Sequence, residues 1–97
     1  MNYEIRTTQL FNKWMASLKD RQASLAIAMR LDRAANGNLG DIKSLGDGIS
    51  EIRIFTGKGY RLYFTIRDRS IIFLLHGGDK SSQQHDIKKA KELAKNL

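Results

Sequence analysis

Cationic and phenolic side chains gather in the segment RIFTGKGYRLYFT (residues 53–65), which has the pattern of a β-hairpin. Its Gly-Lys-Gly turn at 57–59 is a hairpin signal, because glycine adopts the backbone angles that tight turns require. Alternate residues of a strand point to the same face, so Arg61 and Tyr63 share one face of the second strand, and Arg53 lies on the same face of the first. We therefore expect a patch of hydrogen-bond donors formed by Arg53, Lys58, Arg61 and Tyr63.

Such a patch suits cleavage of an RNA backbone, in which a ribose 2′-hydroxyl attacks the adjacent phosphate and negative charge gathers on the non-bridging oxygens. The planar fork of an arginine holds two of these oxygens at once. A tyrosine hydroxyl can orient the attacking group, or its ring can stack on an unpaired base. A lysine acts as acid or base only where neighbouring cations lower its pKa. Exposed sheet faces also carry Arg, Thr and Tyr for ordinary cross-strand pairing, so a purely structural role stays open.

Two residues after the hairpin can extend the patch. His76 ends the third strand before two glycines, where it can serve as an acid or base or simply make a backbone contact. Lys80 follows those glycines and can reach the same face. The run GGDK at 77–80 lacks the GxxxxGK[ST] spacing of a phosphate-binding loop, so it predicts a strand-to-helix turn. Glu51 can pair with Arg53 or Arg61 and neutralise part of the patch.

The chain is expected to fold as a single domain, residues 1–97, of the α+β class with the order β-α-α-β-β-β-α. Strands are expected at 2–6, 50–55, 59–66 and 70–76, and helices at 8–19, at 20–36 and from Ser81 or Ser82 to the C-terminus. Residues 37–48 are rich in glycine and turn formers and predict a connection. The linkers at 56–58 and 67–69 permit only antiparallel hairpins, because a parallel crossover needs about a dozen residues. The last three strands therefore form a meander.

The first two helices are expected to form a hairpin that covers one face of this sheet. Thr7 or Thr8 can cap the first helix and Asp20 the second. The second helix is expected to turn Leu25, Ala28 and Met29 inward. The apolar side of the sheet should meet the helical hairpin, with Ile52, Ile54, Tyr60, Leu62, Phe64 and Ile66. The second face then carries the patch, and the third strand of the meander is apolar on both sides, as in a central covered strand.

Charge and composition limit the classes of function. Seventeen Lys and Arg against ten Asp and Glu give a net charge of +7 and a pI near 10.0, which favours a phosphate backbone or an acidic protein as partner. The chain has no cysteine, and its two histidines lack HExxH spacing, so neither a metal nor a cofactor is expected. No apolar run approaches the roughly 18 residues of a membrane span, and the N-terminus lacks the layout of a signal peptide, so we expect no membrane partner and a cytoplasmic location.

Two long segments resemble the short toxins known as addiction-module killer proteins, within the RelE/ParE and HigB-like toxin superfamily. These segments are GISEIRIFTGKGYRLYFT and SIIFLLHGGDKSSQQHDIKKAKELA, and the resemblance covers nearly the whole chain. It implies the fold described above and a toxin encoded beside a cognate antitoxin, commonly a helix-turn-helix protein, that binds and blocks it. The positions that match the superfamily pattern are Arg53, Lys58, Arg61, Tyr63 and Lys80.

The resemblance implies more than one activity. RelE-like members cleave mRNA in the ribosomal A site without a metal, whereas ParE-like members share the fold and inhibit DNA gyrase. RelE-type enzymes use a tyrosine near the C-terminus and the HigB type a histidine-rich ending, but this chain ends in KELAKNL, which leaves the proton-transfer roles unassigned. A ribosome-dependent, metal-independent mRNA endoribonuclease is favoured. The alternatives are a gyrase inhibitor, a nucleic-acid-binding module, and an inactive toxin that serves in repression of its own operon.

Overall fold

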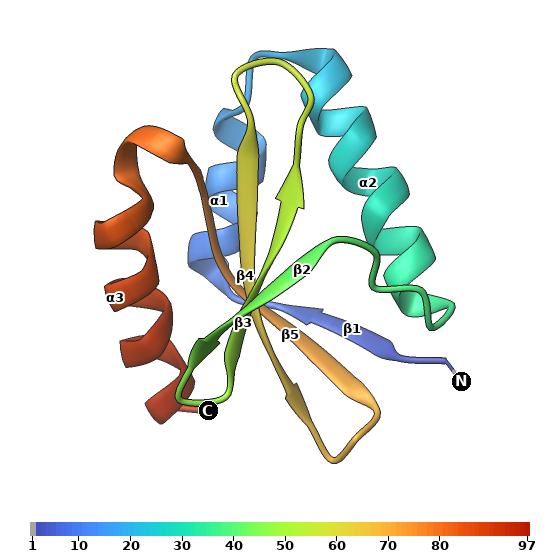
Figure 1. Cartoon of the computed structure of the whole chain (residues 1–97), viewed down its shortest axis with the longest axis vertical. Helices are drawn as coiled ribbons and strands as arrows, with labels where there is room; N and C mark the ends of the chain where they lie inside the picture. Colours follow the sequence, from blue (N-terminus) through green and yellow to red (C-terminus); the bar gives the residue numbers. More distant parts are fainter. Residues whose placement is uncertain (1) are drawn as a thin grey trace.

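A mixed five-stranded sheet forms the centre of the computed structural model, which describes residues 2–97 (Figure 1). The strands lie in the order β1-β5-β4-β3-β2; β1 runs parallel to β5, and the remaining neighbours are antiparallel. The strands are β1 (Glu4–Thr7), β2 (Ile42–Gly46), β3 (Ile49–Ile54), β4 (Tyr60–Arg67) and β5 (Ile71–Asp79). The helices are α1 (Gln9–Ser17), α2 (Arg21–Ala35) and α3 (Gln83–Lys95), with a short 3-10 helix at Lys80–Ser82. The predicted α+β class and the order of the predicted elements are confirmed.

Local sequence signals fix the ends of the first two helices. The Thr8 hydroxyl accepts a hydrogen bond from the Phe11 amide at 3.0 Å and caps α1. The Asp20 carboxylate accepts hydrogen bonds from the amides of Gln22 and Ala23 and caps α2. Gly37, with φ of 96°, follows the end of α2 in the left-handed backbone conformation that favours glycine.

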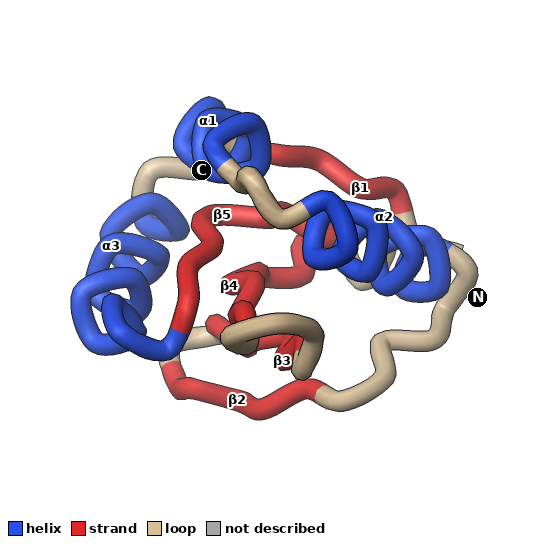
Figure 2. The backbone as a smooth tube through the Cα atoms, turned by 90° about the horizontal axis from the view of Figure 1, so that it is seen from above, coloured by secondary structure: helices blue, strands red, loops and turns tan. Residues whose placement is uncertain are grey.

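The helices lie on both sides of the sheet. Viewed from above, α3 lies on one side of β5 and β4, and α2 lies on the other (Figure 2). The larger apolar core joins α1 and α2 to the sheet through residues that include Phe11, Ile27, Leu62 and Phe64, and a second core under α3 contains Ile49, Leu75 and Ala90. The predicted apolar face of β3 and β4 is therefore confirmed except at Ile66, which is exposed near the end of β4, and β5 is covered on both sides as expected. None of the helices among residues 2–97 is long and apolar enough to cross a membrane.

Two expectations about the elements are wrong. Residues 42–46, predicted as part of a connection, form the edge strand β2, because their backbone pairs with β3 although their side chains are mostly exposed. In α2 the buried stripe consists of Ala23, Ile27 and Ala34, whereas Leu25 and Met29 are exposed. Alanine at two of the three buried positions lets α2 approach the sheet closely, and this rotates the helix away from the predicted orientation.

Candidate functional site

The face of the sheet beneath α3 carries the predicted patch. Arg53 of β3 lies directly opposite Arg61 of β4, and Tyr63 lies between Glu51 of β3 and His76 of β5 in the register of the strands. The pairing therefore brings these five side chains to one face, as the alternation of residues predicted. Two cations placed directly opposite each other destabilise a sheet unless carboxylates compensate them.

Carboxylates accompany three of the predicted cations. Arg53 Nη2 lies 3.0 Å from Asp41 Oδ1, Lys58 Nζ lies 3.1 Å from Asp79 Oδ2, and Arg61 Nε lies 3.5 Å from Glu51 Oε2. These pairs compensate the facing arginines and reduce the net positive charge of the patch. Lys80 forms no ion pair within the described residues, although it lines a cavity of about 290 Å³ together with Lys58, Asp79 and Ser81.

The ion pairs also set the protonation of the patch. The hydrogen bond and the charge of Asp41 raise the pKa of Arg53, and those of Asp79 raise the pKa of Lys58. The pKa of Asp79 is lowered, first by its hydrogen bond with the Ser81 hydroxyl and then by Lys58. Lys58 is therefore held in its charged form, which suits phosphate binding and opposes a role as general base.

Tyr63 is fully buried, and its predicted position on an open surface is wrong. Helix α3 packs its apolar stripe on this face, so Tyr63 lies in the second core with Ile49, Leu75 and Ala90. Arg53 and Arg61 remain partly exposed at the edge of the covered area, and Lys58 is exposed. The accessible patch consists of Arg53, Lys58, Arg61 and Lys80.

A polar cluster lies under α3 beside this patch. His76 Nε2 is 2.9 Å from Asp86 Oδ1, and Asp86 Oδ2 accepts a hydrogen bond from the Ser82 hydroxyl at 2.5 Å. The buried carboxylate of Asp86 lies against the backbone of Gly78, where a Cβ atom would overlap it. Glycine at 78 therefore allows α3 to bring a carboxylate to the imidazole. Asp86 fixes the ring by holding Nε2, and Nδ1 is buried without a hydrogen-bond partner among the described residues.

Several buried polar atoms of this face have no hydrogen-bond partner within the described residues. They are Glu51 Oε2, Arg53 Nε, Arg61 Nε, Tyr63 Oη and His76 Nδ1. The Arg61 to Glu51 contact is an ion pair that is too long for a good hydrogen bond. Buried polar groups in folded proteins are nearly always paired, so such a concentration of unpaired atoms makes this face the candidate functional site. We call Glu51, Arg61, Tyr63, His76 and Asp86 the acid–base cluster.

Removing the Tyr63 hydroxyl should change the dependence of stability on pH. Burial first, and then the nearby carboxylates of Glu51 and Asp86, raises the pKa of Tyr63 well above its ordinary value. An unfolded tyrosine ionises near pH 10, at which the folded Tyr63 keeps its proton, so the free energy of unfolding should fall by about 1 kcal/mol per pH unit above pH 10. In Tyr63→Phe this contribution disappears, and stability at pH 7 should be unchanged or up to about 1 kcal/mol higher because an unpaired hydroxyl is lost.

Urea unfolding at pH 7 and at pH 11 measures both effects. The matched control is Tyr3→Phe, which keeps Tyr63 and should retain the alkaline loss of the parent chain. Equal alkaline losses in the parent and in Tyr63→Phe would show that Tyr63 is not buried as described.

Sequence reasoning missed one member of the acid–base cluster, Asp86, and the burial of another, Glu51. Asp86 had no assigned role, because its contact with His76 depends on which face of the sheet α3 covers. Its local signal is the spacing of one helical turn between Ser82 and Asp86, with Ser82 four residues after Gly78. Glu51 was expected to pair with Arg53 or Arg61, and its pairing with Arg61 is confirmed, but the burial of its carboxylate was not predicted.

A cavity of about 600 Å³ lies on the opposite side of the β3–β4 hairpin, against the turn between α1 and α2. It is lined by residues that include Trp14, Lys19, Asp20, Lys58 and Asp79. Its carboxylates offset its lysines, so it offers no net positive charge to a phosphate backbone. The edge of the acid–base cluster with Arg53 and Arg61 is the better candidate for a nucleic-acid contact.

Comparisons with known proteins extend these observations. The family model described as phage derived protein Gp49-like (DUF891) matches residues 13–97. A protein of Haemophilus influenzae described as an uncharacterized protein is 47% identical over 97 residues, which cover 100% of this chain and 98% of that protein.

Three solved structures share the fold at low sequence identity. The free E. coli toxin RelE, as a double mutant, has a TM-score of 0.71 and 17% identity over 92% of this chain and 98% of its own. The RelBE2 toxin–antitoxin complex of Mycobacterium tuberculosis has a TM-score of 0.65 and 20% identity over 82% of this chain and 100% of its own. The intact E. coli RelBE toxin–antitoxin complex has a TM-score of 0.63 and 15% identity over 79% of this chain and 95% of its own. These likenesses confirm the predicted RelE-like fold.

Proposed function

The chain belongs to the Gp49-like (DUF891) family of phage-derived proteins, and from this membership and its RelE-like fold we propose that it is the toxin of a type II toxin–antitoxin module. Its activity is metal-independent cleavage of mRNA on the ribosome, and a cognate antitoxin neutralises it. The observation that supports this activity best is the facing pair of Arg53 and Arg61 at the edge of the acid–base cluster. Two of the similar structures are complexes of a toxin with its antitoxin, which supports a protein partner.

The accessible patch binds the phosphates of the RNA. Arg61 is the side chain that joins the patch to the acid–base cluster, and its fork holds the non-bridging oxygens of the phosphate at which the bond breaks. Arg53, Lys58 and Lys80 hold the flanking phosphates. Because Asp41, Glu51 and Asp79 already pair with three of these cations, phosphates must compete with carboxylates for them.

The buried residues of the acid–base cluster carry out the proton transfers of the reaction. The 2′-hydroxyl loses its proton as its oxygen forms a bond to phosphorus, and the 5′-oxygen gains a proton as its bond to phosphorus breaks. His76, oriented by Asp86 through Nε2, accepts the proton of the 2′-hydroxyl at Nδ1 and then donates it to the 5′-oxygen. Because Nδ1 is buried, His76 makes these contacts only when α3 lifts from the sheet. The pKa of Tyr63 is raised, so its hydroxyl acts as a hydrogen-bond donor, and it reaches the RNA only when α3 lifts from the sheet.

Expression of the chain alone should arrest growth and produce new 5′ ends within ribosome-bound mRNA, as mapped by primer extension. Co-expression of the protein encoded by the adjacent reading frame should restore growth. An arrest without new 5′ ends but with accumulated gyrase–DNA cleavage complexes would overturn cleavage of mRNA. Growth at the normal rate in the absence of any partner would overturn the toxin assignment itself.

Releasing Arg53 from its carboxylate should strengthen RNA binding. Because the Arg53–Asp41 ion pair is partly exposed, the gain is small, and Asp41→Asn should raise the affinity for a short single-stranded RNA by up to about fivefold at low salt. The substitution leaves in place the main-chain carbonyl of residue 41, which accepts hydrogen bonds from the Arg30 side chain and from the Arg53 amide. Fluorescence anisotropy measures the affinity.

Asp47→Asn is the control for this change. It removes the same charge from an exposed carboxylate that pairs with Lys91 at 3.3 Å, outside the patch. A similar gain in both variants would indicate a nonspecific effect of net charge and would remove Arg53 from the RNA-binding surface.

A further inference from the structure

Large apolar side chains are exposed beside the β3–β4 hairpin. Leu25 and Met29 of α2 are 63% and 50% exposed, and Phe55, just after β3, is 77% exposed. Leu25 and Met29 are four residues apart and therefore lie one above the other on the same face of the helix. Single exposed apolar residues are ordinary, but a contiguous group of them marks an interaction surface.

A groove separates α2 from the end of β3 at this place. It has a volume of about 220 Å³, and its lining includes the apolar residues Ala26, Met29, Ile54 and Phe55 and the cations Arg30 and Arg33. Among residues 2–97, no carboxylate lines it. We call this feature, together with the neighbouring Leu25, the α2 groove.

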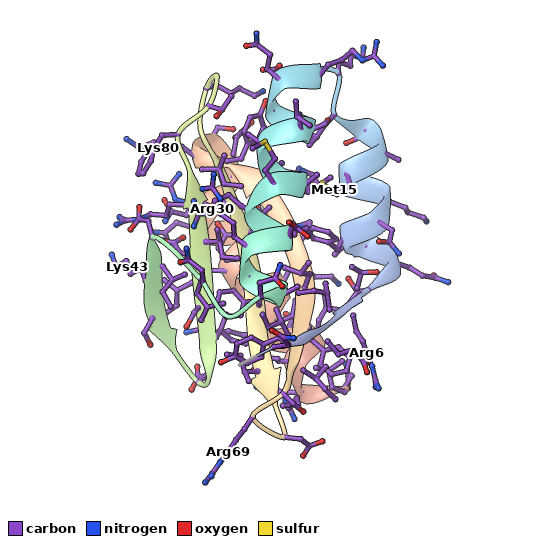
Figure 3. All side chains as sticks on the ribbon, turned by 90° about the vertical axis from the view of Figure 1, so that its right-hand side faces the viewer. Arg6, Met15, Arg30, Lys43, Arg69 and Lys80 are labelled. Atoms are coloured by element: carbon purple, nitrogen blue, oxygen red, sulfur yellow. The ribbon has the colours of Figure 1, made fainter. Side chains whose placement is uncertain are left out.

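The wall of the α2 groove is fixed in place by Arg30. Its guanidinium donates hydrogen bonds to the carbonyl groups of Arg53, Leu39 and Asp41 at 2.9, 3.1 and 3.3 Å. Figure 3 shows Arg30 between α2 and the strands β2 and β3. The groove is thus formed before any partner binds, and a rigid surface loses little entropy on association. Because Arg30 is engaged in this way, Arg33 is the cation left at the rim to meet a partner.

We propose that the α2 groove is the docking site of the antitoxin, which binds it with an acidic amphipathic helix. The inference rests on the proposed function, because that function supplies the partner. The apolar face of such a helix covers Leu25, Met29 and Phe55, and its carboxylates face Arg33. Apolar anchors beside an all-cationic rim match this chemistry, whereas RNA would require donors in place of the exposed leucine and methionine.

The charge of the chain argues against a second copy as the occupant. Each copy carries a net charge of +7, and the rim of the groove is itself cationic, so like charges would oppose self-association. An acidic helix instead gains from the same field, both in affinity and in the rate of encounter.

Docking in the α2 groove also explains how a partner could block the RNA site. The Arg53 guanidinium carbon lies 6.0 Å from the centroid of the Phe55 ring. A helix that covers Phe55 therefore lies next to one of the proposed phosphate contacts. The groove and the accessible patch meet at this pair of residues.

Binding of the purified protein encoded by the adjacent reading frame tests the proposal. Met29→Glu replaces a central apolar anchor of the groove with a carboxylate. Loss of such an anchor should raise the dissociation constant of the complex by about 30-fold or more. The control is Leu97→Glu, which replaces a side chain of similar exposure, 48%, and adds the same charge outside the groove. It should stay within about threefold of the parent. Thermal unfolding checks that both variants fold.

In cells, Met29→Glu expressed alone should still arrest growth, because it lies outside the accessible patch and the acid–base cluster, while the antitoxin should no longer rescue it. Equal binding of the parent and Met29→Glu would overturn the proposal, as would failure of the parent to bind this protein. A parent that is dimeric by light scattering and becomes monomeric as Met29→Glu would identify a second copy as the occupant. Absence of growth arrest by the parent would refute the toxin function, and the dissociation constants would still decide the docking site.

Discussion

Replacing Arg61 by lysine should lower the rate of mRNA cleavage by about 100-fold, the loss that follows removal of one preorganised donor to a developing anion. Lysine keeps the positive charge that Glu51 requires, but it lacks the planar fork that holds two phosphate oxygens. The stability of the variant should therefore stay within about 1 kcal/mol of the parent, because the lysine still places a positive charge beside the buried Glu51 carboxylate. Primer extension on ribosome-bound mRNA and urea unfolding measure the two quantities.

Alanine is a poor choice at this position, although the sequence suggests that it would leave the fold intact. The Glu51 carboxylate is buried and pairs with Arg61, so Arg61→Ala leaves an isolated buried charge and should lower the free energy of unfolding by about 3–5 kcal/mol. Loss of growth arrest in that variant would then report unfolding. Arg69→Lys, at the tip of the β4–β5 turn (Figure 3), is the matched control and should cleave at the rate of the parent. Parental cleavage by a folded Arg61→Lys would mean that the guanidinium fork does not hold the phosphate.

Local patterns predicted the elements that depend on local chemistry. Caps at Thr8 and Asp20 and the alternation along β4 are decided by neighbouring residues, and the structure confirms them. The edge strand β2 is different, because Lys43 and Ser44 give it no apolar pattern and its strand conformation comes from backbone pairing with β3. Such a strand is recognised only when its partner is known.

The surroundings of the predicted patch depend on contacts between distant segments. An amphipathic α3 was evident from the sequence, but the side of the sheet that it covers was not, and this choice decides that Tyr63 is buried and that Asp86 meets His76. Asp41 reaches Arg53 only because β2 forms. The shared face of Arg53 and Arg61 followed from alternation alone, whereas the carboxylates that neutralise them required the tertiary structure.

The two exposed residues of α2 are a second case in which tertiary contacts decided burial, but here residues that were predicted to be buried are exposed. Leu25 and Met29 were expected to face the core as apolar residues of the second helix. The structure buries Ala23, Ile27 and Ala34 instead, since small residues allow close packing of α2 on the sheet. The residues whose burial was wrongly predicted, Leu25 and Met29, therefore belong to the surface that we propose binds the antitoxin.

Replacing His76 by glutamine should lower the rate of mRNA cleavage by about 100- to 1,000-fold, within the range that general acid–base catalysis contributes. Glutamine can still reach Asp86 with a side-chain amide, so the contact that joins β5 to α3 is kept, but it cannot exchange a proton. Single-turnover cleavage on programmed ribosomes measures the rate, and urea unfolding checks that the variant folds.

Asp86→Asn separates orientation of the imidazole from proton transfer. The amide keeps the shape and the hydrogen bond with the Ser82 hydroxyl, but it no longer offers the imidazole a carboxylate partner, so cleavage should fall by about tenfold. His85→Gln alters the other histidine of the chain, which is exposed on α3, and should cleave as the parent does. If His76→Gln folds and cleaves at the rate of the parent, the imidazole at 76 transfers no proton, and its contact with Asp86 serves only to hold α3 on the sheet.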